Sequence, residues 1–253
     1  MKYCILASGS KGNSIYVESQ DARFLIDVGL SAKQIEQRLQ TRSIDPASID
    51  AIVLTHAHSD HVRGVSVFAK RYQIPVYGHP DTLDNITRFL KPAQPVEPRV
   101  EPFQIKNIHF TPFRVSHDCD PTVGYLIEND GKVFAICTDL GVVTDDVLRH
   151  VEKANALLLE SNHDPEMLMG GPYPWDLKER IAGRRGHLSN HNAGEVLYEI
   201  FGNQLDHVVL GHLSDKNNHP ELALKTVQKY VGRQHAGRVT VIEQKTVSEM
   251  FSL

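Results

Sequence analysis

Cysteine is scarce in this sequence, and long apolar runs are absent from it. The three cysteines, Cys4, Cys119 and Cys137, are widely spaced and form no C-x-x-C pair, which argues against a disulfide framework and against a cysteine zinc site. No apolar stretch approaches the roughly 20 residues that span a membrane. The apolar run 3–7 is too short for the core of a signal peptide. We therefore expect a cytoplasmic protein in a reducing compartment, with no membrane partner.

An excess of basic charge is also missing. Lysine and arginine number 27 against 31 aspartates and glutamates, which gives a formal net charge of −4. This balance excludes a basic coat for nucleic-acid binding, so a nucleic-acid substrate would have to be met by a local patch or by metal ions. The 253 residues, 41% of them hydrophobic, suffice for a sizeable buried core. Nothing in this composition indicates an obligate protein partner.

Short strand-like runs alternate with helix-like runs along the chain. Asp130-Gly131 favours a hairpin turn, and Ser31 is placed to cap a helix that carries Ile35 and Leu39 on one face. The stretch 91–102 holds four prolines and predicts an extended connector. The other expected strands are 2–7, 15–18, 23–26, 51–54, 74–77, 108–115, 124–128, 133–137, 156–159 and 208–210, and the other expected helices are 62–72, 81–90, 145–153, 176–182, 193–201 and 222–230.

The order of these elements predicts an α/β fold. Two strand-rich halves with helices between them favour two sheets that pack face to face, with the helices outside. We expect residues 1–253 to form a single domain of two pseudo-symmetric halves, which divide near residues 91–102.

The most informative segment follows the apolar run 51–54. There Thr55-His56-Ala57-His58-Ser59-Asp60-His61 places three imidazoles and one carboxylate within seven residues. Neutral imidazole nitrogens and carboxylate oxygens are preferred ligands of Zn²⁺ and similar divalent ions. Residues two apart in an extended segment point the same way, so His56, His58 and Asp60 can converge while His61 faces elsewhere. This geometry suits two adjacent metal sites better than one.

Further potential ligands lie just beyond the predicted strands. His117, Asp139 and His212 each stand two residues past the last apolar residue of such a run, as His56 does. Strand ends in a stack of sheets gather at one rim, so these residues can meet although they are far apart in sequence. The whole set holds five histidines and two aspartates, enough for two divalent metals with one shared ligand. Such ligands admit Zn, Mn or Fe, with Zn or Mn favoured.

The same residues carry a family resemblance. The pattern H-x-H-x-D-H, followed by His, Asp and His, resembles that of the metallo-β-lactamase-fold hydrolases, and the match runs from the Asp27-x-Gly29 strand end to His212. The resemblance implies a four-layer αββα sandwich of two mixed β-sheets. An aspartate at the bridging position implies a phosphodiesterase or thioesterase branch. The implied ligands are His56, His58 and His117 for a first metal, Asp60, His61 and His212 for a second, and Asp139 as the bridge.

Within this superfamily the chain is most similar to the small WalJ/YycJ-type exonuclease group. That similarity implies 5′-to-3′ exonuclease action on DNA, which the protein would bind through its phosphates. A hydroxide that bridges the two metals would attack the phosphorus in line. The similarity rests on Ser8-Gly9-Ser10-x-Gly12-Asn13-Ser14, Glu160-Ser161-Asn162-His163-Asp164, Gly186-His187-Leu188-Ser189-Asn190, and Gly211-His212-Leu213-Ser214 with Asn217-Asn218.

Several other residues are candidates for the chemistry. Asp60 can hold or deprotonate the nucleophile, and a pocket imidazole, His187 or His163, can protonate the leaving oxygen. His187 shares a Gly-His-Leu-Ser tetrapeptide with His212 but follows a polar stretch, so we assign it to the pocket and His212 to the metal. Asp27 would orient a ligand imidazole from behind, although a turn-forming role fits nearly as well.

Substrate contacts are expected from the glycine-rich loop 8–14 and from the basic stretch 178–185. That stretch follows Tyr173 and Trp175, and the combination fits base stacking with phosphate contact. A solvated helix face with a buried tryptophan fits it equally well. The candidate substrate-binding residues are Ser8, Ser10, Asn13, Asn162, Arg184 and Arg185.

Rival functions remain open at this point. Hydrolysis of thioesters or of cyclic nucleotides uses the same ligands. Processing of tRNA 3′ ends is disfavoured because the sequence has no long basic insertion. In a different class, the protein would be a catalytically silent metal-binding scaffold, but a scaffold does not need all seven ligand positions.

Overall fold

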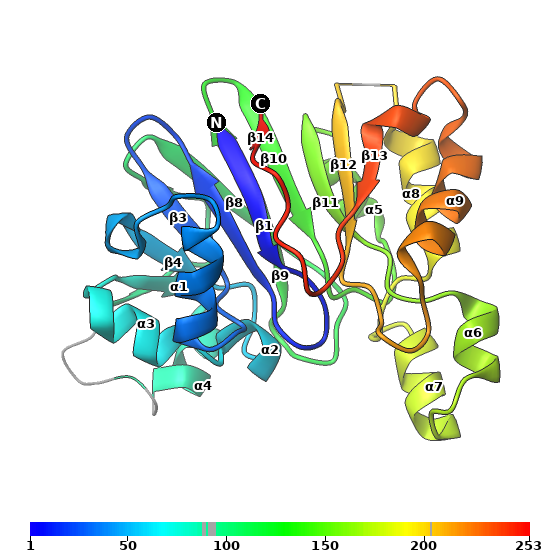
Figure 1. Cartoon of the computed structure of the whole chain (residues 1–253), viewed down its shortest axis with the longest axis horizontal. Coiled ribbons are helices and arrows are strands. Elements are labelled where there is room, and N and C mark those ends of the chain that lie inside the picture. Colours follow the sequence, from blue (N-terminus) through cyan, green and yellow to red (C-terminus); the bar gives the residue numbers. More distant parts are fainter. Residues whose placement is uncertain (88–89, 91–94, 203) are drawn as a thin grey trace.

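Two mixed β-sheets lie face to face, with helices on both outer faces (Figure 1). The computed structural model describes residues 1–87, 90, 95–202 and 204–253, and within these ranges each sheet has seven strands. The predicted fold class, a four-layer αββα sandwich, is confirmed.

The first sheet holds the N-terminal strands together with the last strand of the chain. Its strands pair antiparallel from β14 to β3 and parallel from β3 to β6. In spatial order they are β14 (Phe251–Ser252), β1 (Lys2–Ala7), β2 (Ser14–Glu18), β3 (Arg23–Ile26), β4 (Ala51–Val53), β5 (Val76–Gly78) and β6 (Val96–Pro98).

The second sheet also combines antiparallel and parallel strands. Its strands pair antiparallel from β7 to β10 and parallel from β10 to β13. In spatial order they are β13 (Val239–Val241), β12 (His207–Gly211), β11 (Ala156–Glu160), β10 (Lys132–Cys137), β9 (Val123–Asn129), β8 (Ile108–Arg114) and β7 (Phe103–Ile105). The chain thus passes from one sheet to the other between Pro98 and Phe103, inside the expected connector.

Three apolar layers hold the sandwich together. The layer between the sheets is rich in aromatic rings, with Tyr3 stacked on Phe134 at 4.0 Å and Phe24 edge-on to Phe110 at 5.3 Å. Successive strand residues face opposite sides, so Cys4 leaves this layer and joins the one under the helices of the first sheet. A third layer lies under the helices of the second sheet.

The helices cover the sheets in two groups (Figure 1). α1 (Ala32–Gln40), α3 (Val65–Tyr72) and α4 (Pro80–Thr87) pack on the first sheet, and α5 (Asp145–Val151), α8 (Asn190–Ile200) and α9 (Pro220–Val231) pack on the second. α6 (Pro165–Gly170) and α7 (Trp175–Ala182) project from one end. The short elements are α2 (Ser59–Val62) and the 3-10 turns η1 (Pro46–Ser48) and η2 (Ala236–Arg238).

Most of the expected elements are present, and the differences have physical causes. Ser31 caps α1 as predicted, through a reciprocal contact with Gln34. The expected helix 62–72 is divided at Gly64, because the Gly64 amide donates to the Val28 carbonyl oxygen at 2.8 Å and not to the preceding helical turn. α8 begins three residues before the expected 193, because the Ser189 side chain accepts a hydrogen bond from the Asn192 amide.

Residues 88–89 of the expected helix 81–90, and 91–94 of the expected connector, lie outside the described residues. In the described part of the connector, residues 96–98 are extended and form β6, and the chain bends at residues 100 and 101. Among the helices in the described part of the chain, none is long and apolar enough to cross a membrane.

Candidate metal centre

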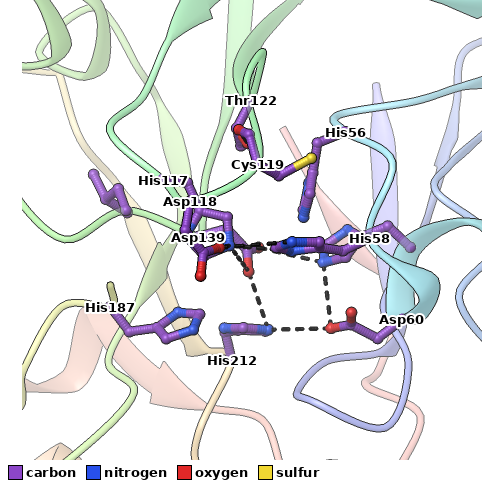
Figure 2. A network of polar contacts seen from close by, with 12 residues as sticks. His56, His58, Asp60, His117, Asp118, Cys119, Thr122, Asp139, His187 and His212 are labelled. Carbon is purple, nitrogen blue, oxygen red and sulfur yellow. Dashed lines mark hydrogen bonds and ion pairs between the residues drawn. The ribbon is translucent and has the colours of Figure 1, made fainter. Parts of the chain in front are cut away.

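All seven predicted metal ligands meet in one place (Figure 2). The chain turns sharply after the strands that deliver them. Asp27, Asp139 and His212 adopt left-handed backbone conformations, with φ of 60°, 59° and 55°, which non-glycine residues rarely adopt. Strained positions of this kind concentrate at functional sites.

The ligands form two clusters, in the division that the family pattern implies. His56, His58 and His117 place one candidate ligand atom each within 4.8 Å of one another, and Asp60, His61 and His212 do the same. His117 Nε2 lies 3.3 Å from His58 Nδ1, the separation expected of two nitrogens about 2.0–2.1 Å from one tetrahedral ion.

Asp139 lies between the two clusters. Its Oδ2 is 3.4 Å from His61 Nε2, and its Oδ1 is 3.4 Å from His212 Nε2 and 3.9 Å from His117 Nε2. It also groups with His56 and His61 as a possible ligand set. One carboxylate therefore reaches both clusters, as a bridging ligand must.

The donor atoms fit a cation. His56 Nε2, His212 Nε2 and Asp139 Oδ2 are buried and have no hydrogen-bond partner within the described residues. Buried polar atoms without a partner are costly and uncommon in folded proteins. Divalent metal ions would satisfy all three, because neutral imidazole and carboxylate are their usual ligands.

Groups behind the clusters hold the imidazoles in place. Asp27 Oδ2 lies 2.7 Å from His61 Nδ1, and Asp27 Oδ1 accepts a hydrogen bond from the Thr55 amide at 2.9 Å. His56 Nδ1 lies 3.0 Å from Thr55 Oγ1, and His117 Nδ1 lies 3.1 Å from the carbonyl oxygen of Gly186. Each of these rings therefore presents its Nε2 to the centre. The expected orienting role of Asp27 fits this geometry.

Glu160 is the main residue that the sequence reasoning missed. It is fully buried, and its Oε1 contacts His212 Nδ1 at 2.6 Å and His187 Nδ1 at 2.8 Å. Its Oε2 accepts hydrogen bonds from the amides of Leu140 and Leu188. Burial by itself raises the pKa of Glu160, but the two imidazoles outweigh burial and the pKa is lowered. A signal was available, because Glu160 also ends an apolar strand.

Three residues that were predicted to contact substrate form hydrogen bonds with residues of the second cluster. Ser8 is buried, and its Oγ accepts a hydrogen bond from the His212 amide at 2.7 Å. Asn162 Nδ2 donates to the His212 carbonyl at 2.8 Å. Asn13 Nδ2 lies 3.2 Å from Asp60 Oδ2 and 2.9 Å from His61 Nε2. Ser8 and Asn13 are thus better described as supports of the second cluster, while Asn162 also borders the adjoining pocket.

A glycine lets two loops meet behind the second cluster. A Cβ at Gly29 would lie 1.6 Å from the carbonyl oxygen of Asp60. That oxygen accepts a hydrogen bond from the Asn13 amide at 2.7 Å. The segment Asp27-Val28-Gly29 therefore supports the site in two ways. Asp27 contacts His61 through its carboxylate, and Gly29 allows close backbone packing against Asp60.

A pocket of about 200 Å³ adjoins the clusters, with Ser10, Asn162, Tyr173, Arg180 and His187 on its wall. His187 lies between pocket and clusters, since it also groups within 4.8 Å of Asp139, Glu160 and His212. Burial alone lowers the pKa of His187, but the Glu160 carboxylate outweighs it and the pKa is raised.

His163 is a different case from His187. It is buried, and it belongs to neither cluster. Burial lowers the pKa of His163 to about 4, so at neutral pH its ring carries no proton to donate as a cation. Of the two expected proton donors, the structure places only His187 at the site.

The two arginines predicted to contact substrate do not line this pocket. Arg184 is exposed and borders a different groove, next to Gly141. Arg185 Nε donates to the His117 carbonyl at 2.8 Å. The arginine that faces the pocket is Arg180. Trp175 is 63% exposed, so the alternative of a buried tryptophan is wrong.

Comparisons with known proteins agree with this geometry. The family model described as Beta-lactamase superfamily domain matches residues 22–212. The exodeoxyribonuclease WalJ of Streptococcus pneumoniae is 39% identical over 93% of this chain and 90% of its own length, and the exodeoxyribonuclease YycJ of Bacillus anthracis is 34% identical over 94% and 91%.

A solved structure shows the same fold. The metallo-β-lactamase fold protein YhfI from Bacillus subtilis superposes with a TM-score of 0.76 over 98% of this chain and 99% of its own, at 17% sequence identity. The chain therefore belongs to the metallo-β-lactamase-fold hydrolases, and it is similar over nearly its whole length to exonucleases of the WalJ/YycJ group.

Proposed function

We propose that this protein is a dinuclear metal-dependent exonuclease that hydrolyses DNA from a 5′ end. The observation that carries the proposal is the pair of ligand clusters joined by Asp139. Relatives at 39% and 34% identity are named exodeoxyribonucleases, which supports DNA as the substrate. Zn²⁺ or Mn²⁺ is the expected metal.

When bound, two divalent ions would supply a hydroxide nucleophile at neutral pH and neutralise charge on the phosphate. The protein's own groups would control the protons. Asp60 belongs to the second cluster and is only partly buried, so its carboxylate can also orient the nucleophile. His187 has its Nδ1 tied to Glu160, which leaves Nε2 to donate a proton to the departing 3′ oxygen of the terminal nucleotide.

The pocket fits one nucleotide better than a length of duplex. Tyr173, Leu177 and Ile181 give it an apolar wall for a base, while Ser10 and Arg180 offer donors to a phosphate. An exonuclease needs this kind of site, because it must seat a chain end beside the reacting phosphate.

We further propose that residues 1–253 form one domain that acts in the cytoplasm without an obligate protein partner. Support for one domain comes from β14, the last strand, which pairs with β1 and so ties the end of the chain to its beginning. The apolar layer between the sheets also draws on both halves.

The proposal predicts close to two metal ions per chain in protein prepared without chelator. His61→Ala and Asp139→Ala should each abolish DNA hydrolysis and leave circular dichroism unchanged. His109→Ala, an exposed histidine on β8, is the matched control and should retain full activity. A firmly mononuclear protein would reject the bridged mechanism.

A substrate panel separates the rival functions. It contains 5′-phosphorylated duplex DNA, single-stranded DNA, RNA, cyclic nucleotides and thioesters. Preferential hydrolysis of 5′-phosphorylated DNA supports the proposal. Turnover of thioesters or cyclic nucleotides alone would reject the nuclease, and metal binding without any turnover would favour the silent scaffold.

A further inference from the structure

His58 is the most loosely held imidazole of the centre. The other four metal-cluster imidazoles place their second nitrogen 2.6–3.1 Å from a fixed oxygen. His58 Nε2 instead lies 3.6 Å from Asp118 Oδ1, beyond hydrogen-bond distance, and its side chain is 35% exposed. The geometry of the first cluster therefore depends on how closely Asp118 approaches this ring.

The two carboxylate oxygens of Asp118 face different neighbours: one faces the first cluster and the other contacts α7. Its Oδ1 is buried without a hydrogen-bond partner among the described residues and lies 3.3 Å from His117 Nε2. Its Oδ2 accepts from Arg180, at 2.6 Å from Nε and 2.5 Å from the terminal nitrogen Nη2. Figure 2 shows Asp118 beside His117.

Arg180 in turn faces the pocket. Its side chain is 63% exposed, and it borders the cavity together with Asp118 and His187. A guanidinium binds phosphate as readily as carboxylate, through paired hydrogen bonds. A phosphate in the pocket therefore competes with Asp118 for Arg180.

We propose that Arg180 and Asp118 form a relay through which a phosphate in the pocket tightens metal binding at the first cluster. The inference rests on the proposed metal centre, but it does not require that DNA be the substrate. When Arg180 turns to a phosphate, Asp118 loses its compensating charge. The freed carboxylate then attracts the Nε2–H of His58 and the cation beside it, and binding couplings of this kind are reciprocal.

Substitution of Asp118 and substitution of Arg180 should have opposite effects on metal affinity. Asp118→Asn removes the charge behind His58 and should weaken Co²⁺ binding at the first cluster by about tenfold, as for other groups that support metal ligands. Arg180→Gln removes the positive charge that pairs with Asp118. This variant should therefore bind Co²⁺ more tightly at the first cluster. If the ion pair merely held α7 in place, both variants would weaken binding alike, and that result would overturn the relay.

Competition with a chelating indicator would measure these affinities in a background that carries Asp60→Ala, which disables the second cluster. Stepwise Co²⁺ titration of the chain with both clusters intact repeats the comparison if Asp60→Ala fails to fold. Arg149→Gln on α5, also an exposed arginine in an ion pair, is the matched control and should not change the affinity. A background chain that binds no Co²⁺ at all would count against the metal centre itself.

Thymidine 5′-monophosphate is the probe for the phosphate. It should tighten Co²⁺ binding severalfold in the parent chain and much less in Asp118→Asn and Arg180→Gln. An equal effect in all three proteins would show that the phosphate acts only by direct contact with the metal, which would overturn the inference. DNA turnover plays no part in either readout, so a failed relay and a failed exonuclease proposal are distinguishable.

Discussion

Two buried carboxylates orient imidazoles of the second cluster. Metal-binding histidines usually donate their second N–H to an acceptor that fixes the ring. Asp27 does so for His61, and Glu160 does so for His212. Glu160 has a wider role, because the same oxygen also contacts His187. One buried residue thus joins the second cluster to the proposed proton donor.

Glu160→Gln should weaken metal binding at the second cluster by about 10–100-fold, the usual cost of losing such support. The amide keeps the size of the side chain but removes the charge that faces two imidazoles. Metal affinity measured by indicator competition checks this expectation. Glu152→Gln, an exposed residue at the end of α5, serves as control, and equal affinities in both variants would contradict the role of Glu160.

The seven candidate ligands, which the structure brings together, were found in the sequence because each has a local signal. His56 and Asp139 stand just beyond a strand, where a continuous apolar run ends, and the same reasoning would have found Glu160. Asp118 and Arg180 carry no such signal. They are 62 residues apart, and only the packing of α7 beside the first cluster brings them together.

At the level of elements, α7 is where the sequence left two alternatives open. The helix projects away from the sheets (Figure 1), and Trp175 at its start is 63% exposed. An exposed indole on the helix that also brings Arg180 to the pocket suits base stacking. The helical period alone could not show this, because an amphipathic pattern does not reveal which neighbours a projecting helix has.

Trp175→Ala should weaken binding of a single-stranded oligonucleotide by about 1–3 kcal/mol, the range for one stacked base, and leave thermal stability unchanged. The sequence contains one tryptophan, so its fluorescence reports on this helix directly and should be quenched when the oligonucleotide binds. Tyr198→Ala on α8, 70% exposed, is the control. Unquenched fluorescence at saturation would contradict stacking on Trp175.

Strand length alone did not decide which strands were expected, because β4 and β5 are as short as β13 and were expected from their apolar runs, whereas β13 and β14 were not. β13 and β14 have three and two residues, and their assignment depends on pairing with distant strands, since strand propensity reflects tertiary context more than local sequence. The longer runs, such as β1 and β11, were found because they are buried on both faces and read as continuous apolar segments.

Across the whole molecule, the site exists because two similar sheets meet. Each sheet has an antiparallel part and a parallel part. His58 follows the first sheet, whereas His117, Asp139 and His212 follow strands of the second. Each ligand cluster therefore takes residues from both sheets, and bound metal would tie the two together.

Metal removal should for that reason lower the stability of the entire protein. An ion that binds the folded chain and not the unfolded one adds about 2.7 kcal/mol per site when its free concentration is 100 times the dissociation constant. Thermal unfolding in EDTA should occur at a lower temperature than unfolding in Mn²⁺ or Zn²⁺. Asp139→Asn should reduce the difference strongly, because it weakens the ligand that reaches both clusters, whereas substitution of the exposed Asp146 on α5, Asp146→Asn, should preserve it. Identical melting temperatures with and without metal would mean that the clusters do not hold ions in the folded state.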